Sequence, residues 1–69
     1  MDEILIKDEF IKLGQLLKLA GLVSSGVEAK IVIQEGEVLY NNEVETRRGK
    51  KVYPGDLVEF NGRIVKVIK

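Results

Sequence analysis

A short basic segment, residues 47–51, carries the side chains best suited to bind a ligand. Four of its five positions are cations: Arg47, Arg48, Lys50 and Lys51. The whole chain has 11 Lys+Arg and 11 Asp+Glu in 69 residues, so its formal net charge is zero. A compact positive patch attracts polyanions even where the overall charge is balanced. The segment therefore predicts a phosphate-binding surface, with an ordinary solvated loop as the alternative.

The residue types that catalysis usually requires are missing or scattered. The chain has no His and no Cys, which removes the commonest general base, thiolate chemistry and the commonest zinc ligands. Ser24, Ser25 and Thr46 have no base at motif spacing. The carboxylates lack metal-loop spacing, and the glycines form no phosphate-loop or dinucleotide fingerprint. We expect no enzymatic activity, no cofactor, no metal and no small-molecule substrate.

Two helices are expected in the first half of the chain, after a short strand at residues 4–6. Apolar residues recur at helical spacing from Phe10 to Ala20, which predicts an amphipathic helix of about three turns, with Asp8 as a possible cap and Gly21 at its end. Ser25 and Glu28 form a capping-box pattern, in which the hydroxyl accepts from the Glu28 N–H and the carboxylate from the Ser25 N–H. A second helix should run from Gly26 to about residue 35.

The second half of the chain has the period and turn residues of short strands. Residues 38–40 and 44 flank Asn41-Asn42, a plausible two-residue turn. Pro54-Gly55-Asp56 is typical turn chemistry, and Asn61-Gly62 predicts a hairpin between strands 57–60 and 63–69. The expected fold class is α+β: two short helices packed on one face of a small, mostly antiparallel sheet of about four to five strands.

Length and composition indicate one soluble domain over residues 1–69. Hydrophobic residues make up 45% of the chain and charged residues 32%, as in globular proteins. No apolar run approaches the roughly 18 residues that a membrane span needs. The acidic start, Met1-Asp2-Glu3, lacks a secretory pattern. We therefore expect a cytoplasmic protein with no membrane partner.

An ordered set of short segments resembles a known family. The segments are Lys12-Leu13-Gly14-Gln15-Leu16-Leu17-Lys18, Gly21-Leu22-Val23, Ser25, Glu28-Ala29-Lys30, Gln34-Glu35-Gly36-Glu37-Val38, Asn41, the stretch 43–51, Pro54-Gly55-Asp56 and Val58. Together they are similar to the S-four-type RNA-binding domain, also called the αL motif, and to its short stand-alone YaaA-like bacterial members. The resemblance covers residues 5–60.

The resemblance implies a non-catalytic module that binds RNA through its two helices and the following hairpin. By position, Lys12 lies where the family often has Arg, Ser25 matches the serine that opens the second helix, and Lys30 matches a frequently basic position. There are three departures: Gly26 replaces an Arg that would touch phosphate, Gly14 replaces a common Asp, and Asn42 replaces the usual Gly, which the turn should tolerate. A basic loop beside the second helix could compensate for the missing Arg.

The sequence thus predicts binding to ribosomal or other structured RNA, by a monomer. The expected contact residues are Lys12, Ser25, Gly26, Lys30, Arg47, Arg48, Lys50 and Lys51. Tyr40 or Tyr53 could stack on an unpaired base, or could belong to the rim of the core.

Two other functions are compatible with the same residues. One is a protein-interaction module that pairs through an exposed sheet edge near residues 64–68. The other is an accessory or vestigial domain that has lost its RNA affinity. Salt-dependent RNA binding would separate the first prediction from both.

Overall fold

Five strands form one sheet in the order β1-β7-β6-β3-β4, and the computed structural model describes all residues from 1 to 69. The bounds are β1 Asp2–Leu5, β3 Val38–Tyr40, β4 Glu43–Val44, β6 Leu57–Phe60 and β7 Arg63–Ile68. β1 runs parallel to β7, and every other neighbouring pair is antiparallel. The expected α+β class with a mostly antiparallel sheet is confirmed.

Two helices lie on one face of this sheet, α1 at Leu13–Leu19 and α2 at Gly26–Gln34. Gly21 and Gly36 come directly after the C-cap residues of the two helices, and both have positive φ (71° and 78°), as the C-cap pattern predicted. α2 matches its predicted bounds. α1 does not, because it has seven residues rather than three turns and begins at Leu13.

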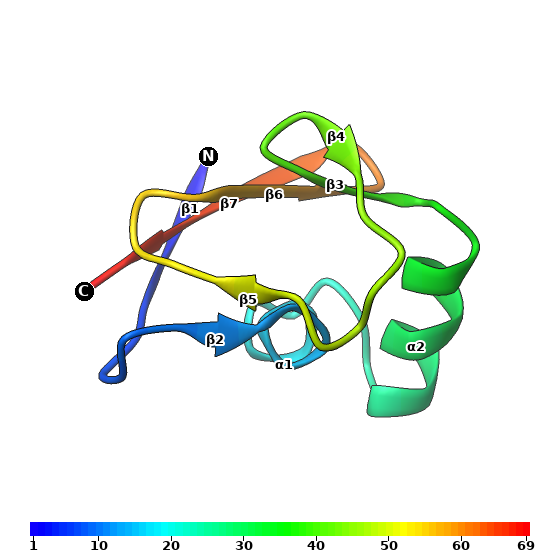
Figure 1. The fold of residues 1–69 in the computed structure, drawn as a ribbon, viewed down its shortest axis with the longest axis horizontal. Helices are drawn as coiled ribbons and strands as arrows, with labels where there is room; N and C mark the ends of the chain where they lie inside the picture. Colours follow the sequence, from blue (N-terminus) through cyan, green and yellow to red (C-terminus); the bar gives the residue numbers. More distant parts are fainter.

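The predicted start of α1 was wrong because a strand interaction takes precedence there. Ile11–Lys12 forms β2, which pairs antiparallel with β5 at Lys51–Val52, in register Ile11↔Val52 and Lys12↔Lys51. Lys12 is consequently the N-cap residue in an extended conformation, without a side-chain cap, and Asp8 caps nothing. This ribbon of two short strands lies beside α1 in Figure 1.

The turns follow the chemistry of their residues. Asn41 and Asn42 both have positive φ (50° and 72°), as do Asn61 and Gly62 (54° and 79°). Positive φ at both central positions gives the turn twist that tight hairpins favour. These turns set the register of β3 with β4 and of β6 with β7.

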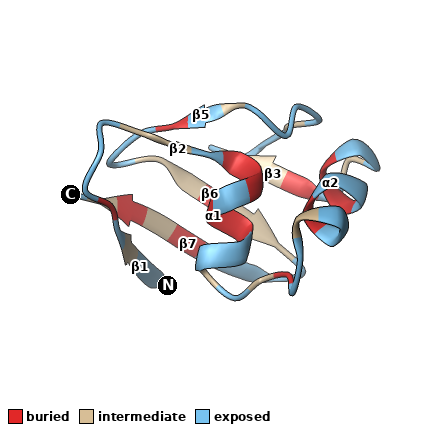
Figure 2. Cartoon of the chain, turned by 90° about the horizontal axis from the view of Figure 1, so that it is seen from below, coloured by how far each residue is buried: buried red, intermediate tan, exposed pale blue.

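The core lies between the sheet and the helices, and Figure 2 shows buried positions on both helices and on the strands. Its members are all apolar: Ile6, Leu13, Leu16, Leu17, Val23, Ala29, Val32, Ile33, Val38, Val52, Val58, Val65 and Val67. They come from both helices, the sheet and β5, together with Ile6 after β1 and Val23 between the helices. Burial of these side chains fixes the helices and the ribbon relative to each other.

The sheet edges differ from the expected ones. β7 is an interior strand between β1 and β6, so the predicted exposed edge near residues 64–68 was wrong. The outer strands are β1 and β4, and β1 carries Asp2 and Glu3. No helix is long and apolar enough to cross a bilayer.

Candidate nucleic-acid interface

The basic loop is docked on the beginning of α1 by its backbone. The amide of Leu13 donates to the carbonyl of Lys50 (2.8 Å), and the amide of Gly14 donates to the carbonyl of Arg48 (3.0 Å). The β2–β5 ribbon continues this contact. In Figure 1 the segment between β4 and β5 descends from the sheet toward the helices. The loop therefore has a fixed position beside the helices.

Gly14 is the residue that permits this close approach. A Cβ atom at position 14 would lie 2.7 Å from Cγ of Arg48, which is shorter than real contacts between such atoms. Glycine in a helix costs roughly 1 kcal/mol relative to alanine. Here the absence of a side chain at position 14 offsets that cost, because it lets the aliphatic part of Arg48 cross the first turn of α1.

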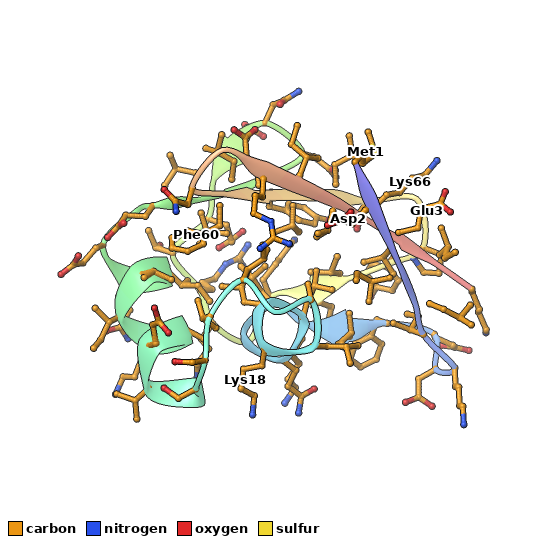
Figure 3. All side chains as sticks on the ribbon, turned by 180° about the vertical axis from the view of Figure 1, so that it is seen from behind. Met1, Asp2, Glu3, Lys18, Phe60 and Lys66 are labelled. Atoms are coloured by element: carbon orange, nitrogen blue, oxygen red, sulfur yellow. The ribbon has the colours of Figure 1, made fainter.

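A hollow, which we call the helix groove, lies where α1, α2 and the loop meet. Its lining residues are Lys12, Gly14, Gln15, Lys18, Gly26, Ala29, Arg48 and Gly49. Three are cations and none is acidic. Lys12, Lys18 and Arg48 form no ion pair in the structure. Figure 3 shows Lys18 pointing from α1 into solvent, on the side of the molecule away from the sheet. The helix groove is thus a positively charged surface without internal neutralisation.

The beginning of α2 adds backbone donors to this groove. Ser25 is the N-cap, and its hydroxyl accepts from the amide of Glu28 (3.1 Å), as predicted. The amides of Gly26 and Val27 have no acceptor within the protein. Unpaired amides and the helix dipole make a helix N-terminus favourable for anions. A Cβ at Gly26 would meet nothing within 4 Å, so packing does not require glycine there.

The predicted return bond of the capping box was misassigned by one residue. The Glu28 carboxylate accepts from the amide (2.8 Å) and hydroxyl (2.9 Å) of Ser24 rather than from the amide of Ser25. These bonds lower the pKa of Glu28, the Ser24 amide contributing most. Glu28 is an ionised acid near the groove, but it does not line it.

The ribbon places two like charges opposite each other. Lys12 and Lys51 are cross-strand partners between β2 and β5. Like charges directly opposite in an antiparallel pair are destabilising. No acidic side chain pairs with either lysine. A bound anion would relieve this repulsion.

A second hollow, which we call the loop hollow, adjoins the helix groove. It is lined by Arg47, Gly49, Lys50, Lys51 and Tyr53, and it shares Gly49 with the groove. No acidic residue lines it either. The two hollows together present all four cations of the basic segment, with Lys12 and Lys18, around one loop.

The four cations of the segment nevertheless differ in their contacts. Arg47 binds Glu45 through Nε to Oε2 (2.9 Å) and through one terminal nitrogen to Oε1 (3.1 Å). That side-chain contact is the main reason that the pKa of Glu45 falls from 4.5 to about 2. Lys50 Nζ lies 4.8 Å from the ring centroid of Tyr40, and Lys51 Nζ lies 4.8 Å from that of Phe10. Arg48 alone has no such partner.

Asp56 fixes the turns behind the loop hollow. Its carboxylate accepts from the Tyr40 hydroxyl (2.6 Å), the Tyr53 amide (2.9 Å) and the Asn41 side chain (3.2 Å). Burial works to raise the pKa of Asp56, but these hydrogen bonds hold it below its ordinary value. The hydrogen bond between the Tyr40 hydroxyl and Asp56 also raises the pKa of Tyr40 to about 12. The turn at residues 54–56 is thereby tied to the end of β3.

The structure brings most of the predicted site residues together. Lys12, Gly26 and Arg48 line the helix groove, and Arg47, Lys50 and Lys51 line the loop hollow. Ser25 caps α2, whereas Lys30 is exposed on α2 and lines neither hollow.

Sequence reasoning missed the other two polar side chains of the groove, Gln15 and Lys18. The available signal was the spacing of three between Gln15 and Lys18, which makes them neighbours on the surface of α1, with Lys12 at its N-cap.

Comparison with known proteins places this arrangement in a family. A family model described as the S4 domain matches residues 4–68. The chain belongs to the S4 domain family. This confirms the resemblance seen in the sequence.

Two bacterial relatives are similar over most of their length. The "Probable ribosome maturation protein RlbA" of Bacillus subtilis (strain 168) is 53% identical over 57 residues, which cover 83% of this chain and 80% of that protein. The "Putative RNA-binding protein YbcJ" of Escherichia coli (strain K12) is 44% identical over 62 residues, which cover 90% of this chain and 89% of that protein.

A solved structure has the same fold. The solution structure of YbcJ from E. coli, described as revealing an αL motif involved in RNA binding, matches with a TM-score of 0.77 and 40% identity. The match covers 100% of this chain and 89% of that one. The S4 domain assignment therefore rests on sequence and on three-dimensional structure.

Proposed function

We propose that residues 1–69 act as a single, non-catalytic domain that binds structured RNA, with the helix groove as the main phosphate-binding surface. The observation that carries this proposal is the concentration of Lys12, Lys18 and Arg48 in one hollow without an acidic lining residue. In a chain of zero net charge, such a gathering of unpaired cations has an electrostatic cost that a bound polyanion offsets.

The contact surface continues along the loop. Arg47, Lys50 and Lys51 extend the positive surface from the groove into the loop hollow. Ser25 and Gly26 supply the beginning of α2 beside it, and Lys30 is an exposed cation further along α2. Arg48 and Gly26 line the same groove, so the loop supplies a cation beside the position where the family resemblance implies an Arg on the second helix. A wide, charged surface of this kind suits recognition by shape and backbone contact.

Ribosomal RNA is the substrate that we favour. The relative RlbA is named as a ribosome maturation protein, and YbcJ is described as having a motif involved in RNA binding. Action on ribosomal RNA implies a cytoplasmic protein.

The sheet edges support a monomer rather than an edge-pairing interaction module. β1 is one edge and carries two acidic residues, and β4, the other edge, has only two residues. Short and charged edges discourage pairing with another strand. We therefore expect one protein molecule per RNA site.

Binding of purified bacterial ribosomal RNA across a salt series tests the proposal. Wild-type affinity should fall steeply with salt, and each of Lys12→Ala, Lys18→Ala and Arg48→Ala should reduce the logarithmic slope by about one. Lys66→Ala is the matched control, because Figure 3 shows Lys66 on the sheet side of the molecule, far from Lys18. Equal slopes for all five proteins, or no wild-type binding at physiological salt, would contradict the proposal; the latter would favour the vestigial domain.

A further inference from the structure

The two tyrosines of the chain have different environments, although Tyr40 ends the short strand β3 and Tyr53 directly follows the short strand β5. The Tyr40 hydroxyl donates to Asp56 (2.6 Å), and Lys50 Nζ lies 4.8 Å from its ring centroid. Tyr40 is also partly buried against the core. Its hydroxyl and its ring are therefore already used within the protein.

Tyr53 has its backbone fixed and its ring available. Its amide donates to the Asp56 carboxylate (2.9 Å), and its carbonyl accepts from the Asp56 amide (2.9 Å). The residue is 45% exposed, and its hydroxyl makes no hydrogen bond to the protein. A ring on a fixed backbone loses little conformational freedom when a ligand covers it.

The surroundings of Tyr53 suit both parts of a nucleotide: the aromatic ring suits the base, and the neighbouring cations suit the phosphate. Phe10 supports the ring from one side, with centroids 5.9 Å apart and an interplanar angle of 53°. A tilted contact leaves the ring open toward the loop hollow, which Tyr53 lines with Arg47, Lys50 and Lys51. An open aromatic face thus lies beside three cations, as in surfaces that hold unpaired nucleotides by stacking and by phosphate contact.

We propose that Tyr53, supported by Phe10, is a stacking platform for one unpaired base of the bound RNA. This inference rests on the proposed RNA-binding function and adds a preference for RNA that contains an unpaired nucleotide. The helix groove holds the phosphate backbone of a structured region, while an unstacked base next to that region covers Tyr53. Stacking depends on the π face, which all bases share, so the site selects an unpaired nucleotide rather than a particular base.

The test uses two RNA hairpins with the same stem, one with a single bulged 2-aminopurine and one fully paired. Wild type and Tyr53→Phe should bind the bulged hairpin more tightly and quench the 2-aminopurine emission. Tyr53→Leu should lose roughly 5- to 150-fold in affinity for the bulged hairpin, the range for stacking on an aromatic ring. Its affinity for the paired hairpin and its salt slope should stay unchanged.

Two controls separate stacking from effects on the fold. Tyr40→Phe keeps Tyr53 and should preserve both the bulge preference and the quenching. In that variant Tyr53 is the only tyrosine, and the chain has no Trp, so its intrinsic fluorescence reports the ring directly. Thermal unfolding of each variant shows whether a lost preference reflects a lost fold.

The outcomes distinguish this inference from the function on which it rests. Arg48→Ala should lower the affinity for both hairpins equally, whereas Tyr53→Leu should lower the affinity for the bulged hairpin alone. Equal affinity of folded Tyr53→Leu and wild type for the bulged hairpin would overturn the stacking platform and leave RNA binding intact. Failure of the wild type to bind either hairpin would overturn both.

Discussion

At the scale of single residues, the basic segment divides into cations with and without internal partners. Arg47 is held by Glu45, whereas Arg48 crosses Gly14 and makes no ion pair. An exposed ion pair contributes little to stability on average. Its importance here is positional, because Glu45 also accepts from the Arg47 amide (3.0 Å) and so fixes the beginning of the loop.

The Glu45 contact predicts a defined dependence of stability on pH. Its pKa is about 2 in the folded protein and 4.5 ordinarily, so the fold favours the ionised form. That contribution is present above pH 4.5 and is lost as pH falls toward about 2. Denaturant unfolding over this range should show a smaller acid loss of stability in Glu45→Gln than in wild type. Parallel curves for the two proteins would contradict the role of Glu45.

The residue scale also shows what the sequence could and could not predict about the site. The cluster at residues 47–51 was visible because its charges are adjacent. Lys18 was not, because an exposed lysine on a helix is ordinary until the loop and α2 are placed beside it. The role of Gly14 was equally hidden, since its reason is a contact with Arg48, 34 positions later in the numbering.

At the scale of elements, local signals predicted the local structures. The Ser25 cap, the positive-φ glycines and the Asn41-Asn42 and Asn61-Gly62 turns all act over a few residues, and they are present as expected. The β2–β5 ribbon was missed because each strand has two residues and their pairing joins distant parts of the chain. That ribbon also shortened α1, since residues 11 and 12 could not be both strand and helix.

The shared position of Arg48 and Gly26 in the groove predicts a rescue. Arg48→Ala should weaken RNA binding, and adding Gly26→Arg should restore much of the affinity, because it returns a cation to the same hollow from α2. Space permits this, since a Cβ at position 26 meets nothing within 4 Å. Affinity at fixed salt and the salt slope should recover together.

A matched variant controls for total charge. Glu59 lies on β6, in cross-strand register with Ile64 on β7 and outside both hollows, so Arg48→Ala with Glu59→Gln restores the net charge without placing a cation in the groove. Equal recovery in this variant and in Arg48→Ala/Gly26→Arg would mean that total charge, not the groove, determines affinity.

At the scale of the whole molecule, folding separates charges that balance in the sequence. The helix side collects Lys12, Lys18 and Arg48 in a hollow with no acidic lining residue, whereas Figure 3 shows the acids Asp2 and Glu3 beside Lys66 on the opposite, sheet side. The fold class could be predicted from patterns of helix, turn and strand. The sequence also indicated that a basic loop could lie beside the second helix. It did not show that this loop docks on α1, because that depends on long-range contacts such as Gly14 to Arg48.

The most direct test of this separation is backbone-amide NMR of the protein titrated with ribosomal RNA hairpins. The largest shift changes should occur at Gly26, Gly49 and Lys18, around the helix groove, with Glu3 and Lys66 on the sheet side unchanged. Changes centred on the sheet side, with the groove amides unmoved, would contradict the account.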